Sequence, residues 1–506
     1  MRREYLPLGS LPAWLRLNGV TTNGVAVQGI GSPGKETDKG NSIVATDVKT
    51  SKESDTSPEV LLRVPSDLVL SLDTVHDHSK SDRHLHDVLE AVGDFGRTTR
   101  GAIMIFLLVQ LTHSCPDTPK YIGISNPWTE YIKFLPPSIP LPTSFSAEEL
   151  QLLRGTSLAA AVEAKTGSLE REFEHLRQST EGVAWCQQCW WAEGTEMLSM
   201  DDWKYIDAAY RSRMLDVPGR GLAMVPCIDM ANHGAGSDAK ALYDTDAQGN
   251  VVLQLRWGQN LQLGEEVTIS YGDEKSASEM IFSYGFLESD RTETNQAVLD
   301  MSLPDDDPLG VAKNMFCRTT PGIRLSTVNN ETNQSMEALP KSLRVTWESP
   351  LAWWASVNEE DGLHMGVTET VDGARELEAI WKGEKIQSPH RLQELLAADP
   401  LWDIFQLRAV VLVSQRLEAQ LALLHEIEGV LSDPYVIQEL HETVCRPEIF
   451  NLISRLRELE SELLQKAIGG LTEQRDHLLE SKTVSAYLAQ QSHEEEEEEE
   501  VAEDFS

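Results

Sequence analysis

The chain is poor in basic residues, and this shortage limits what it can bind. Its 506 residues include 43 Lys and Arg against 81 Asp and Glu, a formal net charge of −38. Residues 494–506 hold seven consecutive glutamates and two further acids, but the rest of the chain is acidic too. Such a surface disfavours binding along a phosphate backbone, so we expect no nucleic-acid partner. It can steer a lysine-rich protein toward the chain, or it can simply maintain solubility.

Long apolar runs are also missing. The N-terminal MRREYLPLGS is not followed by the apolar core of a secretory signal. The most apolar stretch, residues 102–111 (AIMIFLLVQL), falls short of the ~20 residues that cross a bilayer. We therefore expect a buried helix there, no membrane span, and a cytoplasmic or nuclear protein.

Cysteine is scarce, with six in the whole chain. Only Cys186 and Cys189 lie close together, and no second Cys or His pair follows at the spacing of zinc ligands. We expect no metal site and reduced thiols, as in intracellular proteins.

The length predicts two or three domains. Apolar residues recur every three or four positions through 89–203, which predicts helices. Ser146 followed by Glu149 predicts a capping box that opens a helix at AEELQLL. Short strands are predicted on both sides of Pro65 and over 222–287, where ALYD and VVLQLRW form a hairpin and EEVTISY a further strand. Beyond Asp290 long amphipathic helices are predicted.

Four short motifs carry the strongest functional signal. They are RSRM at 211–214, DMANH at 229–233, ISYG at 269–272 and YGF at 284–286. In this order and spacing they resemble the SET domain, specifically the branch similar to the plant Rubisco large-subunit lysine methyltransferases. The resemblance extends to LPAWLRLNGV near the N-terminus and to the helical run at the C-terminus, and so covers most of the chain.

The resemblance implies an α+β fold. A split SET domain of short twisted β-sheets with a knot-like core would occupy 1–290, interrupted by a helical insert at about 95–205. An all-helical substrate-binding domain would follow over 300–490. The acidic residues 491–506 are expected to form a disordered tail.

The same resemblance assigns site residues. Tyr271 matches the catalytic tyrosine, and Tyr284 and Phe286 match the walls of a channel for the substrate lysine. Aromatic rings suit an aliphatic stem with a cationic head, although each ring could instead be ordinary core.

Further matches concern the cofactor, S-adenosyl-L-methionine. Asn232 and His233 match the Asn-His pair that binds it, and Arg213 matches the arginine near its carboxylate; His233 could be mainly structural, and Arg213 could form an exposed salt bridge. The family's GxG loop is altered here, because Gly40-Asn41-Ser42 has serine in place of the second glycine. Since glycine permits close backbone approach, Ser42 puts cofactor affinity in question.

The function implied is methylation of a lysine on a non-histone protein, for example a lysine-rich ribosomal protein or translation factor. Two alternatives remain open: methylation of a histidine ring, and a SET-derived binding module without activity. A chromatin enzyme is disfavoured because the chain has neither a cysteine-rich segment beside the motifs nor a basic patch.

Overall fold

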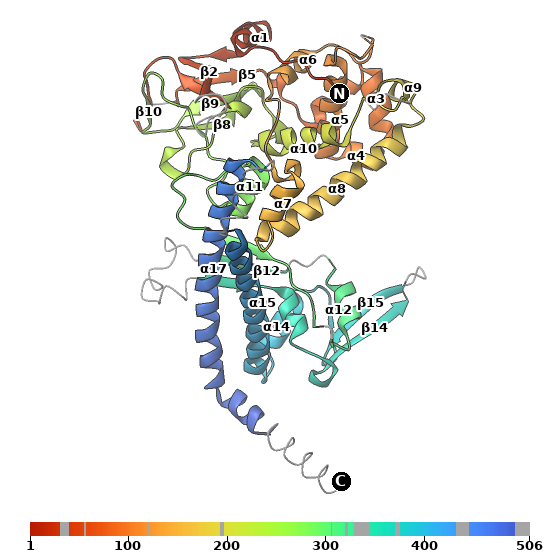
Figure 1. Ribbon diagram of the computed structural model, residues 1–506, viewed down its shortest axis with the longest axis vertical. Helices are drawn as coiled ribbons and strands as arrows, with labels where there is room; N and C mark the ends of the chain where they lie inside the picture. The colour runs from red at the N-terminus through yellow and green to blue at the C-terminus, as the bar shows by residue number, and fades with distance from the viewer. Residues whose placement is uncertain are drawn as a thin grey trace. The chain divides into compact units, whose positions relative to one another are not determined.

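The computed structural model describes the following residues: 1–30, 40–54, 57–119, 121–192, 197–304, 306–318, 322–327, 345–369, 375–431 and 445–490. The chain divides into two compact units (Figure 1). Unit 1 comprises Met1–Phe145, Val162–Glu274 and Met280–Phe286, and unit 2 comprises Ser146–Ala161, Lys275–Glu279 and Leu287–Ser506. The domain limits expected from sequence stay a prediction, and the expected disordered tail lies outside the described residues.

The strands of unit 1 form small antiparallel sheets. The largest has the order β1-β5-β9-β8, with bounds Thr21–Thr22, Val60–Val64, Val251–Leu255 and Ala241–Thr245. The predicted hairpin is confirmed, since β8 pairs with β9 along its whole length. Three two-stranded ribbons complete the set: β2 (Val25–Ile30) with β3 (Gly40–Ala45), β4 (Lys49–Thr50) with β10 (Asn260–Leu261), and β6 (Met214–Val217) with β7 (Gly221–Met224).

The helical part of unit 1 is built around α5 (Thr99–Ser114), which is buried on nearly all sides. This confirms the predicted buried helix. Its residues are apolar around the whole circumference, as expected for a helix that other elements cover on every side. The other helices of this part are α2 (Leu72–Ser79), α3 (Arg83–Ala91), α4 (Asp94–Arg97), α6 (Pro127–Tyr131), α9 (Ala184–Cys189) and α10 (Met200–Arg213).

Three sequence expectations in unit 1 are corrected. After Pro65 the chain forms a 3-10 turn, Ser66–Leu68, and no second strand. Trp257 lies beyond the end of β9 and is exposed, so it does not share the buried face of that strand. The segment 265–271 is extended but forms only isolated bridges, because its backbone groups bond to several different partners.

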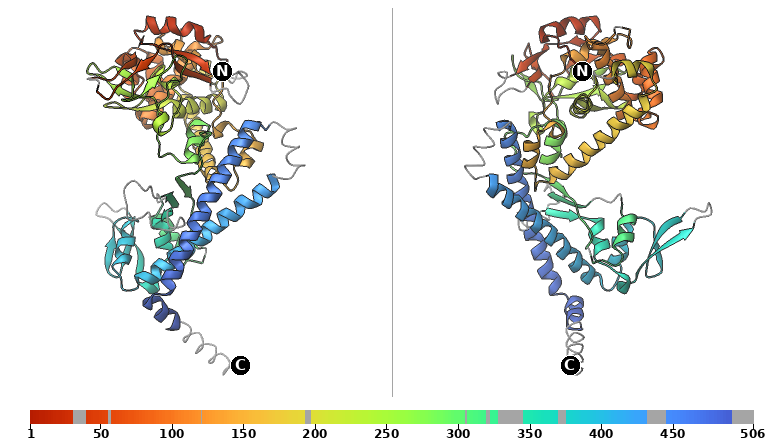
Figure 2. Two further views of the ribbon diagram at one scale, coloured as in Figure 1. Left: turned by 90° about the vertical axis from the view of Figure 1, so that its left-hand side faces the viewer. Right: turned by 45° about the vertical axis from the view of Figure 1, so that its right-hand side comes forward.

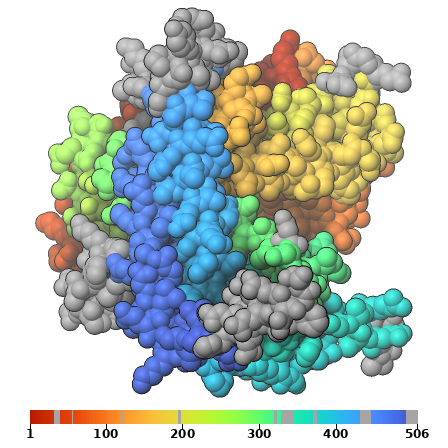
Figure 3. All heavy atoms as spheres, turned by 60° about the horizontal axis from the view of Figure 1, so that its bottom comes forward, coloured from red at the N-terminus to blue at the C-terminus, as the bar shows by residue number. Residues whose placement is uncertain are grey.

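Unit 2 combines long helices with two small sheets. Helices α15 (Trp402–Leu431) and α17 (Pro447–Leu479) pack lengthwise against each other (Figures 2 and 3). Their predicted leucine stripes supply buried contacts, for example Leu417, Leu456 and Leu463. The capping box of Ser146 and Glu149 is confirmed at the start of α7 (Ala147–Leu152). Two further helices, α8 (Ser157–Thr180) and α11 (Ala277–Tyr284), each begin in unit 2 and end in unit 1.

The expectation of an all-helical C-terminal domain is wrong for residues 296–386 of unit 2, which contain two small sheets. Strands β11 (Gln296–Leu299), β12 (Ile323–Thr327) and β13 (Val345–Glu348) form one antiparallel sheet. A second sheet contains β14 (Leu363–Glu369), β15 (Arg375–Trp381) and β16 (Glu384–Ile386). Strands β14 and β15 each have one largely exposed end, so their apolar alternation is weak and easily missed. Helices α12 (Gly310–Phe316), α13 (Pro350–Ala355) and α14 (Arg391–Ala397) accompany the sheets.

The six cysteines are buried and form no disulfide. Within the described ranges, no helix has the length and apolarity needed to cross a membrane. In the same part of the chain, no group of three or more His, Cys, Asp or Glu side chains could hold a metal ion.

Candidate active site

The site is built where two extended segments of unit 1 run side by side. The carbonyl of Asn232 accepts the N–H of Ile269 at 2.9 Å, and the carbonyl of Ile269 accepts the N–H of Gly234 at 3.0 Å. On its other side the same segment bonds to β3, with Val267 N–H donating to the Ile43 carbonyl at 2.8 Å. Residues 265–271 are thus held between β3 and the DMANH motif, which fixes the position of Tyr271.

Tyr271 is bound at both its backbone and its hydroxyl. Its N–H donates to His233 Nδ1 at 3.0 Å, and its Oη donates to the Ala231 carbonyl at 2.7 Å. Burial raises the pKa of Tyr271 well above its usual range, so the hydroxyl is neutral at physiological pH. Because its hydrogen is committed to Ala231, the oxygen offers its lone pairs in other directions.

Aromatic rings gather around the ring of Tyr271. The ring centroid of Tyr284 lies 4.4 Å from that of Tyr271, and those of His233 and Phe286 lie 5.2 and 6.4 Å from it. Tyr284 ends α11, and Gly285 then turns the chain with φ +80°. A Cβ on Gly285 would stand 2.7 Å from the Pro140 carbonyl oxygen, so only glycine fits this turn. The structure therefore brings Tyr271, Tyr284 and Phe286 together, as the motifs predict.

A largely buried ion pair, Arg213 with Asp229, lies beside the aromatic cluster. Arg213, the last residue of α10, donates through Nη1 to the carbonyl and to Oδ2 of Asp229, at 3.0 and 3.3 Å. Its buried Nε has no hydrogen-bond partner among the described residues. Burial raises the pKa of Asp229, while Arg213 and the hydroxyl of Tyr131 oppose that shift. Arg213 is thus no exposed salt bridge but a largely buried cation whose Nε donor has no partner among the described residues.

The altered glycine loop connects to the Asn-His pair through a carboxylate. The Ser42 hydroxyl and the Asn232 side-chain amide both donate to Glu266 Oε1, each at 2.7 Å. Ser42 is fully buried, and its φ is not in the left-handed region, whereas Gly40 has φ +71°. The serine side chain is accordingly directed into the protein, and only Gly40 needs the freedom of glycine.

Sequence reasoning overlooked Asp229, Glu266 and Tyr131. Tyr131 Oη donates to Asp229 and accepts the N–H of Cys227 at 2.7 Å, which secures the unusual φ of +71° at Cys227. Two of the three lie inside the quoted motif stretches: Asp229 is a buried acid in DMANH, and Glu266 is a half-buried acid beside the apolar residues of EEVTISY. An acid among apolar residues was the sequence signal that could have identified these two residues as part of the site.

No family model matches the chain, but individual proteins do. SET domain-containing protein 8 of Schizosaccharomyces pombe is 28% identical over 443 residues, covering 87% of this chain and 91% of that protein. An Arabidopsis thaliana chloroplast fructose-bisphosphate aldolase-lysine N-methyltransferase is 27% identical over 187 residues, covering 36% of this chain and 37% of the relative. The actin-histidine N-methyltransferase of Xenopus tropicalis is 22% identical over 311 residues, covering 60% and 47%.

Solved structures show the same fold. The SET domain of LSMT bound to methyl-lysine and AdoHcy is 17% identical with a TM-score of 0.59, and the match covers 94% of each chain. Rubisco LSMT bound to AdoMet gives a TM-score of 0.57, with coverage of 94% of this chain and 93% of the other. The predicted split SET fold is confirmed over most of the chain. In its motifs and its fold the chain is therefore similar to SET-domain methyltransferases of the branch that includes the Rubisco large-subunit lysine methyltransferases.

Proposed function

We propose that this protein transfers a methyl group from S-adenosylmethionine to the side-chain nitrogen of a lysine in another, non-histone protein. One observation carries the proposal: Tyr271, whose neutral hydroxyl is fixed by the Ala231 carbonyl, lies in a cluster of aromatic rings beside the largely buried Arg213. Nitrogen methylation requires orientation more than acid–base power, and a fixed hydroxyl among rings supplies orientation.

The residues present fit the cofactor. Arg213 has a buried donor without a partner, which suits a carboxylate, and the backbone at Gly40 adopts the open conformation that allows close approach. Asn232, held by Glu266, would bind further polar groups of S-adenosylmethionine. When bound, the cofactor supplies a methyl group on a positively charged sulfur.

The chain's own residues then prepare the nucleophile. Tyr271 cannot serve as a general base because burial keeps its hydroxyl protonated. Its free lone pairs can accept weak C–H···O contacts from the moving methyl or orient the nitrogen. Tyr284 and Phe286 would surround the lysine stem, and the loss of water there lowers the pKa of the ammonium. The neutral amine forms as its proton leaves to solvent.

The substrate class rests on supporting arguments. The relatives named above act, by their names, on aldolase, Rubisco and actin, all of them proteins. The acidic surface of this chain favours a lysine-rich partner such as a ribosomal protein or translation factor. We place the reaction in the cytoplasm or nucleus, which microscopy of the tagged protein tests.

Histidine is the second candidate nucleophile. Its support is the likeness to actin-histidine methyltransferases, which spans 60% of this chain. An imidazole ring could also pack against the rings of Tyr284 and Phe286. The two targets differ in product, so mass spectrometry of the methylated residue separates them.

The test is methyl transfer from labelled S-adenosylmethionine into a methylation-depleted lysate, comparing the native chain with Tyr271→Phe. We expect labelled protein with the native chain and a rate at least about 100-fold lower in the variant, because orientation of the reacting groups is lost. Tyr205→Phe is the matched control, since Tyr205 Oη also donates to a backbone carbonyl, that of Pro136 at 2.9 Å. Absence of both labelling and cofactor binding by the native chain would favour an inactive binding module.

A further inference from the structure

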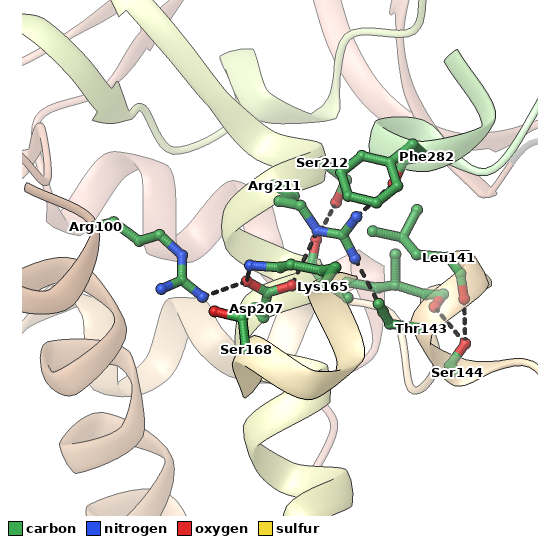
Figure 4. A network of polar contacts seen from close by, with 12 residues as sticks. Arg100, Leu141, Thr143, Ser144, Lys165, Ser168, Asp207, Arg211, Ser212 and Phe282 are labelled. Carbon is green, nitrogen blue, oxygen red and sulfur yellow. Dashed lines mark hydrogen bonds and ion pairs between the residues drawn. The ribbon is translucent and has the colours of Figure 1, made fainter. Parts of the chain in front are cut away.

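A buried carboxylate in α10 forms ion pairs with three cationic side chains. Asp207 is fully buried, and its Oδ1 lies 2.7 Å from Arg100 Nη2 and 2.7 Å from Lys165 Nζ. Its Oδ2 lies 2.9 Å from Arg211 Nε. Arg100 also pairs with Glu172 through two bonds of 2.8 and 3.0 Å. Figure 4 shows Asp207 at the centre of this group.

Arg211 differs from the other two cations because it connects the cluster to a distant part of unit 1. Its Nη1 donates to the Phe282 carbonyl at 2.6 Å, and its Nη2 donates to Thr143 Oγ1 at 2.9 Å. The guanidinium carbon also lies 4.5 Å from the centroid of the Phe282 ring. All three guanidinium nitrogens are therefore engaged, each with a different segment of the chain (Figure 4).

The two segments that Arg211 holds both lead to the aromatic cluster. Phe282 stands in α11 two residues before Tyr284, and its carbonyl belongs to the last turn of that helix. Thr143 lies in the 3-10 turn Pro142–Ser144, three residues after Pro140, whose carbonyl oxygen is the atom closest to a Cβ at Gly285. Arg211 thus binds both sides of the turn that carries Tyr284 and Phe286.

The geometry points to Arg211 as a positioning residue for the aromatic channel. With Asp207 as its anchor, it fixes the positions of Tyr284 and Phe286 relative to Tyr271. The planar fork of arginine suits this task because it reaches a carboxylate, a carbonyl and a hydroxyl at once, which a lysine ammonium on a flexible stem cannot do in the same geometry. This inference rests on the proposed function.

A positioning role and a purely structural role of Arg211 predict different effects on kcat and on cofactor affinity. Arg211 contacts neither Arg213 nor Asn232 among its hydrogen-bond partners, so cofactor binding should survive its replacement. A positioning role predicts damage confined to the methyl-transfer step and to the substrate channel. The separation of kcat from cofactor affinity is therefore the decisive readout.

The experiment compares Arg211→Lys with Arg220→Lys in the full-length chain. Arg220 is a matched control in unit 1, since it also donates two bonds to backbone carbonyls, to Ser66 at 3.1 Å and to Gly249 at 2.8 Å. For Arg211→Lys we expect kcat to fall about 10- to 100-fold, because small misplacements near the reacting atoms have effects of this size. Calorimetric affinity for S-adenosylmethionine should stay within about twofold of wild type, and Arg220→Lys should retain wild-type kcat.

A milder pair of variants guards against failure to fold. Thr143→Val removes one acceptor of Arg211, and Thr143→Ser restores a hydroxyl. We expect Thr143→Val to lower kcat severalfold and Thr143→Ser to recover most of it, with unchanged cofactor affinity.

Two results would overturn the inference: kcat for Arg211→Lys equal to that of Arg220→Lys, or a loss of kcat matched by an equal loss of cofactor affinity. A wild-type chain that binds no cofactor and transfers no methyl group would instead refute the proposed function itself.

Discussion

The protonation states of the individual site residues determine which chemistry is open to this protein. Tyr271 stays neutral because burial raises its pKa, and the buried Asp229 also has a raised pKa. The Tyr271 hydroxyl is therefore no general base, and the Asp229 carboxylate is already engaged by Arg213 and by the hydroxyl of Tyr131. The site is suited to orienting a nucleophile that loses its proton to water, and this favours transfer of an activated group over hydrolysis.

At this scale Ser42 yields a specific prediction. Its hydroxyl and the Asn232 amide share Glu266 Oε1, so Ser42→Ala leaves the carboxylate with one of these two donors and frees Asn232 to move. We expect about tenfold weaker binding of S-adenosylmethionine by calorimetry, which corresponds to about 1.4 kcal/mol, the size of one hydrogen bond to a charged group.

The control for this prediction is Ser114→Ala, another buried serine whose hydroxyl bonds to a carbonyl, that of Leu111 at 2.9 Å. It should leave cofactor affinity unchanged. If Ser42→Ala bound the cofactor as tightly as wild type, the connection through Glu266 would have no part in holding Asn232.

The site residues that could be predicted from the sequence differ from those that could not in how far away their partners lie along the chain. Tyr271, Tyr284 and Phe286 stand in motifs whose order along the chain is visible, and the structure brings them together; their roles stay a prediction. Glu266 and Asp229 matter through partners 224 and 98 residues away, Ser42 and Tyr131. Such long-range pairs leave no periodic trace in a single sequence.

Secondary-structure elements whose signals are local were predictable. The capping box at Ser146, the hairpin of β8 and β9 and the buried helix α5 each depend on residues within a few positions of one another. The segment 265–271 was expected to be a strand because its apolar residues alternate. Alternation of this kind fits any extended chain, whether or not it pairs along a sheet. The partners of this segment are β3 and the DMANH motif, and this threading could not be derived from alternation.

A pH-dependent contact within unit 2 provides a prediction at the scale of elements. Glu460 of α17 accepts the Ser157 N–H at the start of α8 at 2.9 Å, and also the Ser157 hydroxyl. Burial raises its pKa from 4.5 to about 7. The folded state therefore disfavours the ionised form, and stability that is fully present below pH 4.5 is lost as the pH rises through 7. The full loss amounts to about 3 kcal/mol.

The variant Glu460→Gln mimics the neutral acid and should remove this component. We expect its melting temperature to exceed that of wild type at pH 8 and the difference to shrink toward pH 5. Glu458→Gln on the same helix is the control, because Glu458 is half exposed and pairs only at the surface with Arg455. Equal pH profiles for wild type and Glu460→Gln would show that Glu460 titrates normally.

For the molecule as a whole, the net charge of −38 is the property that a substrate meets first. Long-range attraction between an acidic enzyme and a lysine-rich protein raises the rate of encounter, and dissolved salt screens it over a Debye length of ~10 Å at 0.1 M. In the proposed mechanism the chemical step takes place inside the aromatic cluster, away from dissolved salt. Salt should therefore act on kcat/KM and leave kcat unchanged.

We expect kcat/KM for a basic protein substrate to fall about tenfold or more between 20 and 300 mM salt, because steered association weakens steeply with ionic strength. A short neutral peptide that contains the same target residue is the control, and its kcat/KM should change little. A chain truncated after residue 490 should keep most of the salt dependence, since the remaining residues are still acidic. If the basic and neutral substrates responded alike, the charge would serve solubility and not recognition, and the search for substrates would no longer favour lysine-rich proteins.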